Sequence, residues 1–131
     1  MLLPSNVSTN KFASPTNNET DAANQLITVP TTTGTPEDYQ KVFALVTSLL
    51  LCNKTNTNLA VSAKIVNGVT SAYILNEINI PPNTSYDVIN GNKFTLKEGD
   101  ILSVWHGSTE SNALDAVLSY TLHRPLTTYD I

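Results

Sequence analysis

The chain has 131 residues, of which 40% are hydrophobic and 14% are charged, and this composition excludes an intrinsically disordered protein. The formal net charge of −4 excludes the concentrated positive charge that a phosphate backbone needs, so we expect no nucleic-acid partner. No apolar run reaches the roughly 18 residues of a membrane-spanning helix, and we expect no membrane partner. The 15 Asn and 18 Thr residues favour turns and strands, and they predict an all-β domain.

Residues 1–24 are predicted to form an extended N-terminal arm. The segment is rich in Ser, Thr, Asn and Pro, and its apolar residues are isolated, among them Leu2, Leu3 and Phe12. Alone, such a segment cannot bury enough apolar surface to offset the entropy lost on ordering. We expect these three residues to contact a neighbouring subunit; the alternative is that the arm packs back along its own domain. The arm lacks the pattern of a secretory signal, so synthesis in a host cytoplasm is expected.

Four segments follow the arm. Residues 25–30 predict a short strand ended by a proline, and residues 31–36 predict a flexible connection. Residues 37–40 are compatible with one helical turn. The run 42–53 is almost continuously apolar, so periodicity cannot distinguish a buried strand from a buried helix. A polar turn and a clear strand come next, which favours a strand, and a helix over 37–51 is the alternative.

Residues 59–96 predict two β-hairpins. Each turn falls on an Asn-Gly pair, at Asn67-Gly68 and at Asn90-Gly91. Asn-Gly between alternating apolar runs is the strongest short-range hairpin signal, because a type I′ turn needs positive φ at both central positions. Between the two hairpins, Pro81-Pro82 must end a strand, since proline has no N–H for the ladder.

The last part of the domain predicts two further strands after a tight turn at Gly99. In the strand 101–106, Leu102 and Val104 share the face expected to be buried, so Trp105 points to the other side. An exposed aromatic residue on a sheet is typical of an interface anchor, and Trp105 is therefore a fourth candidate interface residue. The alternative is that Trp105 fills a second layer or lies under the arm. A strand over 114–122 alternates apolar and polar residues in the same way.

About eight strands at intervals of 8–12 residues predict an antiparallel β-sandwich or jelly-roll-like fold. The expected organisation is the arm at 1–24, the sandwich domain at 25–124 and a short C-terminal tail at 125–131.

No pattern for catalysis, a metal or another cofactor is visible. The only histidines are His106 and His123, and Asp115 lies eight residues from His123 on one strand, roughly 26 Å away, which is too far to share a metal. No G-x-S-x-G motif occurs. Cys52 stands alone, so no intramolecular disulfide is possible, and we expect it to be a small core residue.

The carboxylates that would have to pair in a glycosidase fall in turns and on solvated faces, which does not favour such an enzyme. They are Asp87, Glu98, Asp100, Glu110 and Asp115. We expect a protein that is not an enzyme and uses no cofactor.

Three stretches of sequence, in their order, carry a resemblance to a family. They are LLLCNKTNTNLAVSAKIV, AYILNEINIPPNTSYDVINGNKFTLKEGDILSV and NALDAVLSYTLH. Over residues 42–123 this order resembles small β-sandwich virion structural proteins of tailed bacteriophages, including those of cyanobacterial hosts. The arm and residues 31–36 lie outside the pattern, and no functional residue can be carried over.

The resemblance implies a non-enzymatic component of the virion, present in many copies as a homo-oligomer. Its partners would be other virion proteins, namely capsid, neck or tail subunits, and capsid decoration is one such role. The alternative is a carbohydrate-binding module for a host-surface glycan, in which Trp105 and Tyr73 stack on sugar rings.

Overall fold

The computed structural model describes residues 5–31 and 41–124, which form nine strands and one short 3₁₀ helix, η1 (Ala22–Asn24). The strands are β1 (Ser5–Ala13), β2 (Gln25–Thr28), β3 (Phe43–Asn53), β4 (Leu59–Asn67), β5 (Thr70–Ile80), β6 (Thr84–Asp87), β7 (Phe94–Lys97), β8 (Ile101–His106) and β9 (Leu114–Arg124). The predictions for Leu2, Leu3, residues 37–40 and the tail at 125–131 fall outside these ranges.

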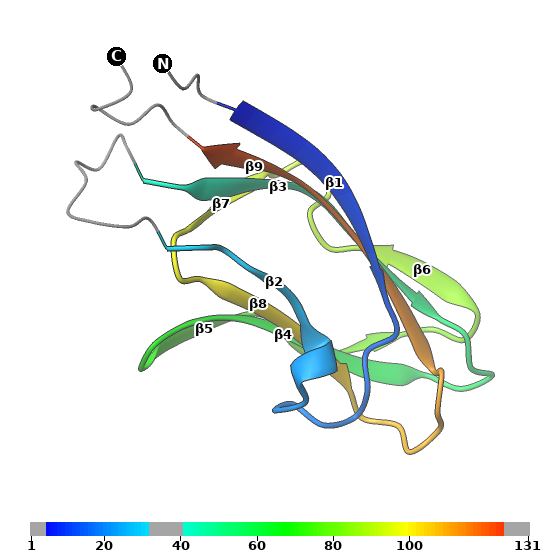
Figure 1. Cartoon of the computed structure of the whole chain (residues 1–131). Helices are drawn as coiled ribbons and strands as arrows, with labels where there is room; N and C mark the ends of the chain where they lie inside the picture. Colours follow the sequence, from blue (N-terminus) through cyan, green and yellow to red (C-terminus); the bar gives the residue numbers. More distant parts are fainter. Residues whose placement is uncertain (1–4, 32–40, 125–131) are drawn as a thin grey trace, which may run out of the picture.

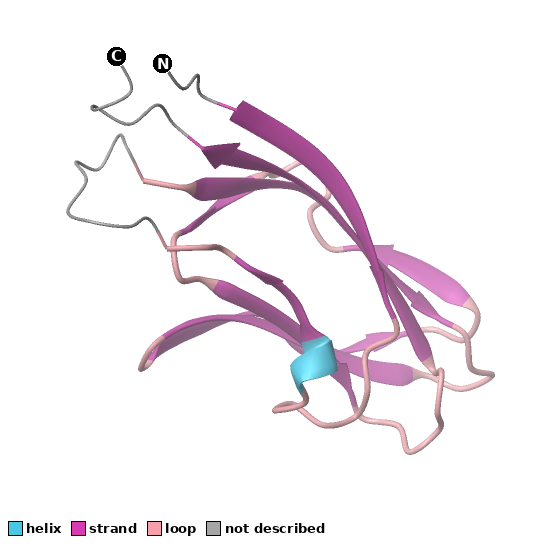
Figure 2. Ribbon diagram, in the orientation of Figure 1, coloured by secondary structure: helices cyan, strands magenta, loops and turns pink. Residues whose placement is uncertain are grey.

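The strands form two antiparallel sheets that lie face to face (Figure 1). One sheet has the order β1-β9-β3-β6, with β7 also paired to β3, and the other has the order β2-β8-β4-β5. In Figure 2, η1 lies at one end of the two layers, close to the four-stranded sheet. The prediction of an all-β antiparallel sandwich is confirmed, with nine strands among the described residues in place of about eight.

The core lies between the two sheets and is built from alternate residues of the long strands, because successive side chains of a strand point to opposite faces. In β3 the buried alternation passes through a register shift between Val46 and Ser48. The strand prediction for this run is confirmed over Phe43–Asn53, and the helix alternative is wrong there. The largest fully buried side chains are Leu26, Val29, Val46, Leu49, Leu51, Leu59, Val61, Ile80, Leu96, Leu102, Leu114 and Leu118.

The N-terminal arm differs most from its prediction. Ser5–Ala13 forms β1, an edge strand that pairs in continuous antiparallel register with β9, from Ser5 opposite Arg124 to Ala13 opposite Ala116. This part of the arm lies along its own domain. Pairing with β9 holds it there, and not the predicted contact with a neighbouring subunit. No sequence pattern indicates this strand, because β1 has no buried face to create a period of two and is held through its backbone.

The first hairpin is confirmed, with a shift of its turn by one residue. Asn67 pairs with Thr70, so the two loop residues are Gly68 and Val69. Gly68 has a φ of +61°, while Val69 is not among the residues with positive φ. This is the pattern of a type II′ turn, which needs glycine at its first central position, and not of the predicted type I′ turn.

The second hairpin prediction is wrong, although its turn is present. Asn90 and Gly91 have φ values of +47° and +86°, and the Asn92 amide donates to the Ile89 carbonyl at 2.9 Å. The flanking strands β6 and β7 do not pair with each other, because both pair with the same edge of β3, one after the other along its length. A strand of 11 residues offers enough length for two short partners.

A buried amide, that of Asn53, joins the two sheets. Its Nδ2 donates to the carbonyl oxygens of Thr57, Ile80 and Pro81 at 2.8, 2.9 and 3.0 Å. Its Oδ1 accepts from the Thr55 amide at 2.9 Å and from the Thr55 hydroxyl at 2.7 Å. Asn53 belongs to β3 in one sheet and Ile80 ends β5 in the other, so this side chain fixes the spacing of the layers at that end.

We expect Asn53→Ala to lower the free energy of unfolding by about 3 kcal/mol, because the change leaves buried carbonyl groups without a donor. Chemical denaturation monitored by circular dichroism measures this decrease. Asn92→Ala, at an exposed turn position, is the matched control and should change the stability by less than about 0.5 kcal/mol. Equal effects of the two substitutions would contradict the assignment.

Candidate interaction surfaces

An apolar row crosses three strands on the outer face of the five-stranded sheet. Phe12 of β1 lies opposite Val117 of β9, and Val117 lies opposite Leu50 of β3. The side chains of Phe12 and Leu50 are 75% and 42% exposed, and Val117 is half-buried. Residues directly opposite in a ladder share one face of the sheet, so the three side chains form one continuous stripe. This cross-strand row is a candidate interaction surface.

The rest of that face is polar along β1 and β9. At these outward positions, a polar side chain of the N-terminal segment lies opposite a polar side chain of β9. The two form a hydrogen bond through hydroxyl, amide, imidazole or carboxylate groups. The hydrogen-bonded pairs are Asn6 with His123, Ser8 with Thr121 at 3.0 Å, Asn10 with Ser119 at 2.7 Å and Ser14 with Asp115 at 3.2 Å. A slip of one residue would break every pair, so this polar ladder fixes the register.

The opposite outer face, on the four-stranded sheet, carries an aromatic and charged cluster. The Trp105 and Tyr73 rings have centroids 6.0 Å apart and planes inclined at 57°. The Lys64 Nζ lies 5.6 Å from the Trp105 centroid and 5.9 Å from the Tyr73 centroid, which is cation–π distance. Glu19, from the segment before η1, binds the same ammonium at 2.7 Å. The hydrogen bond to Glu19 raises the pKa of Lys64.

The structure separates the predicted interface residues. Leu102 and Val104 are fully buried, as expected, so Trp105 points to the outside of its sheet, where it is half-buried. Phe12 lies on the outer face of the other sheet, and the two residues do not share a surface. The roles of Trp105 and Phe12 in an interface stay predictions.

Sequence reasoning missed Val117 and Leu50. Val117 is an apolar residue at a position where the alternation of β9 requires a polar one, and this mismatch was a usable signal. Leu50 offered none, because it lies inside a run that is apolar on both faces. The contact between Lys64 and Glu19 joins residues 45 positions apart, and no local pattern indicates it.

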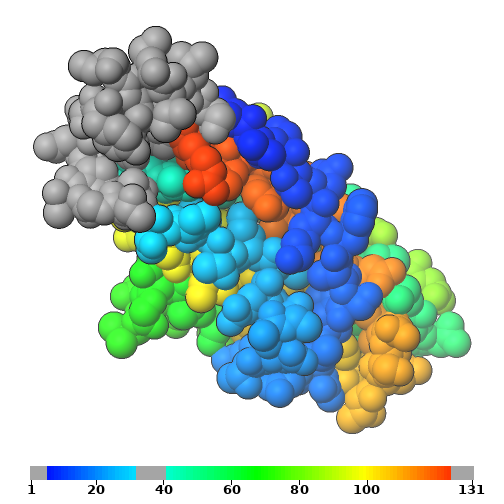
Figure 3. Space-filling view, in the orientation of Figure 1, coloured from blue at the N-terminus to red at the C-terminus, as the bar shows by residue number. Residues whose placement is uncertain are grey.

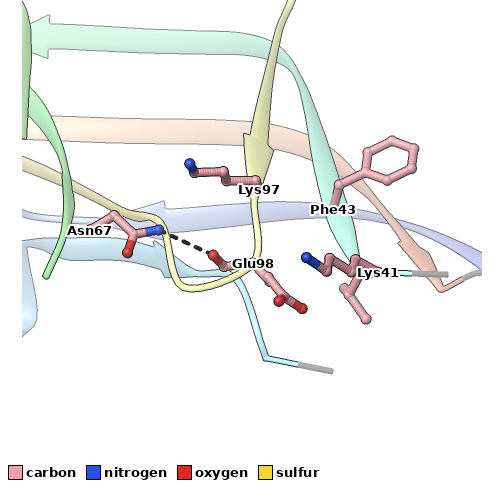
Figure 4. A pocket seen from close by; sticks show the side chains of 6 residues that line it. Lys41, Phe43, Asn67, Lys97 and Glu98 are labelled. Atoms are coloured by element: carbon pink, nitrogen blue, oxygen red, sulfur yellow. Dashed lines mark hydrogen bonds between the residues drawn. The ribbon is translucent and has the colours of Figure 1, made fainter. Parts of the chain in front are cut away.

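A pocket of about 480 Å³ opens at the end of the sandwich where β3 begins and β7 ends (Figure 4). Its described lining includes Lys41, Lys97 and Glu98, so charges of both signs meet there. Asn67 also lines it, and its Nδ2 donates to the Glu98 carbonyl at 3.2 Å and to Asp100 Oδ1 at 2.8 Å. This lining contains a single carboxylate side chain, and a carboxylate pair for glycoside hydrolysis is not found among these residues.

Three of the candidate carboxylates have structural partners. Asp87 Oδ1 accepts from the amides of the turn that follows β6, at 3.2 and 3.1 Å. Asp100 is buried and accepts from the Lys97 amide at 2.9 Å. Asp115 forms an ion pair with Lys54 at 3.0 Å. Within the described ranges, no three metal-ligating side chains of His, Cys, Asp or Glu gather into one group.

His106 is buried at the end of β8 and holds the segment that follows β1. Its Nδ1 accepts from the Ser108 amide at 3.1 Å, and its backbone amide donates to the Thr16 carbonyl at 3.1 Å. Burial lowers the pKa of the imidazole, while the hydrogen bond to the Pro15 carbonyl raises it by less. An Nδ1 that accepts a hydrogen bond cannot carry a proton, so the folded state requires the neutral ring.

We expect acid to weaken the fold through His106. Its folded pKa lies below the ordinary histidine value of 6.5, so the unfolded chain takes up the proton first as the pH falls. The stabilisation is therefore complete above about pH 6.5 and decreases as the pH falls below it. Thermal unfolding between pH 7.5 and 5 measures the slope, and His106→Gln should make it shallower. An unchanged slope in that variant would contradict the role of His106.

Cys52 is free and half-buried, so it is not the core residue that was predicted. It pairs with Asp115 in the ladder, which places it on the outer face of the sheet. The alternation of β3 decides this, because Leu51 and Asn53 on either side point into the domain.

Among the described residues, no helix is long and apolar enough to cross a membrane. No family model matches the chain, and no curated protein matches it. The solved structures that are similar to it include the following two. One is from Bacillus endospore appendages that form a family of disulfide-linked pili, with 16% identity, a TM-score of 0.42 and coverage of 95% of this chain and 90% of that chain. The other is from the T13 IBDV viral particle, with 9% identity, a TM-score of 0.46 and coverage of 92% of this chain and 31% of that chain. Both are too distant to carry an argument about function.

Proposed function

We propose that the chain is a non-enzymatic structural subunit that works in many copies within an assembly. The observation that carries this proposal is the exposed cross-strand row of Phe12, Val117 and Leu50. Single exposed apolar residues are ordinary, but a stripe across three strands of one sheet presents a continuous apolar surface. A partner that covers this row gains the transfer free energy of two large side chains.

The surroundings of the row also fit an interface. An apolar centre bordered by polar groups is the usual anatomy of a protein contact, and the polar ladder of β1 and β9 forms such a border. The charged groups Asp115 and Lys54 at the edge of the row already neutralise each other. One further carboxylate, that of Asp87, lies opposite Leu50 at the end of the row and accepts from two backbone amides.

The assembly we propose is the virion of a tailed bacteriophage, with capsid, neck or tail subunits as partners and capsid decoration as one role. This part rests on the ordered sequence resemblance over residues 42–123. The proposal of a non-enzymatic role is supported by Asp87, Asp100 and Asp115, whose carboxylates are engaged in holding turns and strands.

Self-association should depend on the apolar row. We expect Phe12→Ser and Leu50→Ser each to weaken the oligomer about tenfold or more, because both remove apolar contact at the centre of the interface. Size-exclusion chromatography with light scattering over a concentration series measures this. Val69→Ser is the matched control, since Val69 is fully exposed in the β4–β5 turn, away from the row. Unchanged association in both row variants would overturn the role of this surface.

The virion assignment is tested separately on purified particles. Mass spectrometry should detect the chain in stoichiometric amount, and density at near-atomic resolution should place its sandwich on the particle. Particles that contain no copy of the chain would refute the assignment and leave the self-association result intact.

The second candidate function is binding of a host-surface glycan. The observation that favours it is the Trp105 and Tyr73 pair on the outer face of the four-stranded sheet. Aromatic rings at such a position offer apolar faces on which sugar rings can stack. A glycan array tests it: binding should disappear in Trp105→Ala and persist in Phe12→Ser. An array with no binding by the unaltered chain would dismiss this candidate.

A further inference from the structure

β1 is attached to the domain mainly through its backbone. All nine of its residues pair with β9 without a register shift, yet among residues 6–13 only Thr9 and Ala13 are even half-buried. Val7 and Phe12 are 53% and 75% exposed. Figure 3 shows β1, in dark blue, lying along the surface beside β9. Its removal would leave no cavity, because the fully buried core comes from other strands.

The side-chain contacts of β1 are specific and also easily replaced by water. The polar ladder pairs Ser8 with Thr121 and Asn10 with Ser119 in exposed positions. Exposed hydrogen bonds each contribute little to stability, and breaking them leaves no buried group without a partner. The ladder therefore selects the register of the strand without binding it irreversibly.

The chain is anchored immediately after β1. Pro15 is buried, and Thr16 is fixed by Asn24, whose Oδ1 accepts from the Thr16 amide at 2.8 Å. Asn24 is itself fully buried, and the Thr16 carbonyl accepts from the His106 amide. Detachment would thus stop at Ser14, and the proline that follows keeps Ser14 extended. We therefore expect the strand to move as a unit while the rest of the domain stays folded.

The outer edge of β1 has a feature that disfavours pairing with a further strand. Lys11 lies opposite the buried Leu118, so this charged residue is on the inner side of the edge strand, where its side chain remains exposed. Inward-pointing charges on edge strands are a common protection against another strand pairing there. At the far edge of the other sheet, β5 has an irregular register near Glu77, which has a φ of +52° and whose amide donates to Ser62 Oγ at 2.9 Å.

We infer that β1 is exchanged between copies of this chain, so that β1 of one copy pairs with β9 of a second. This inference rests on the proposed function, since it needs an assembly. The occupant is a second copy because the polar ladder is complementary to β9 of this same sequence. Each hydrogen bond that β1 makes to its own β9 forms again, in the same geometry, with β9 of the second copy. Exchange therefore costs little free energy once neighbouring subunits bring the local concentration into the millimolar range.

Two full-length single-cysteine chains test the exchange, both carrying Cys52→Ser. One carries Ser8→Cys and the other, labelled with ¹⁵N, carries Thr121→Cys. These positions are directly opposed in the ladder, with Cα atoms roughly 4.5–5.5 Å apart, which suits a disulfide. The chains are mixed, incubated until light scattering is constant, oxidised and analysed by mass spectrometry. Thr95→Cys, exposed on β7 and separated from β1 by β9 and β3, replaces Thr121→Cys in the control mixture.

We expect the mixed disulfide between Ser8→Cys and Thr121→Cys on the order of tenfold above the control, because exchange places these two sulfurs directly opposite each other in one ladder. An assembled sample in which the mixed disulfide does not exceed the control overturns the exchange and leaves the proposed function standing. A sample that stays monomeric at every concentration overturns both.

A second variant carries both cysteines in one chain. Oxidised at high dilution, it holds β1 in its own domain, and exchange then predicts that assembly is abolished and returns on reduction. Assembly that is equal in the oxidised and the reduced chain would overturn the inference.

Discussion

Buried amide and carboxylate groups at the two ends of the sandwich hold its sheets in place, and the rest of the structure depends on them. At one end Asn53 donates to carbonyls at the end of β5. At the other end Asp100 accepts from Asn67 and from the Lys97 amide, where the chain crosses from one sheet to the other. Buried polar groups are costly unless satisfied, so each network admits one arrangement of the surrounding backbone. Apolar packing between the sheets supplies stability, and these networks make the packing unique.

These two buried networks show which strands hold the fold together and which strands are available for contact with a partner. β3 and β9 contribute to the core between the two networks, and their inner faces are buried in it. β1 contributes to neither the networks nor the fully buried core. Because this strand buries little side-chain surface, we expect its opening free energy to lie below that of the domain. The strand is therefore suited to changing partner, and β3 and β9 are suited to presenting a rigid outer face.

Sequence reasoning identified the strands that have a buried face, and it failed where a strand lacks one. β8 and β9 were recognisable because Leu102, Val104 and Leu118 recur at alternate positions. β1 was not, since its pairing uses backbone groups that every sequence possesses. The second Asn-Gly turn was found, but its strands were assigned to each other because the capacity of β3 for two partners is a property of the whole sheet. Of the cross-strand row only Phe12 was anticipated, because the row exists only after the register of three strands is fixed.

The two outer faces differ in the groups that already contact their apolar side chains. This difference favours the proposed interface over the proposed glycan site. On the four-stranded sheet the Lys64 ammonium lies near both aromatic rings and is bound by Glu19 at 2.7 Å. A sugar that stacks on Trp105 must share the ring with this cation or displace it, and displacement would break the cation–π contacts. The row of Phe12, Val117 and Leu50 meets no such competitor, because its neighbours on the polar ladder bond to one another. Covering the row removes apolar surface from water without breaking an existing contact. The five-stranded face is therefore the one on which a partner gains most, and it is the face whose edge is formed by the loosely held β1.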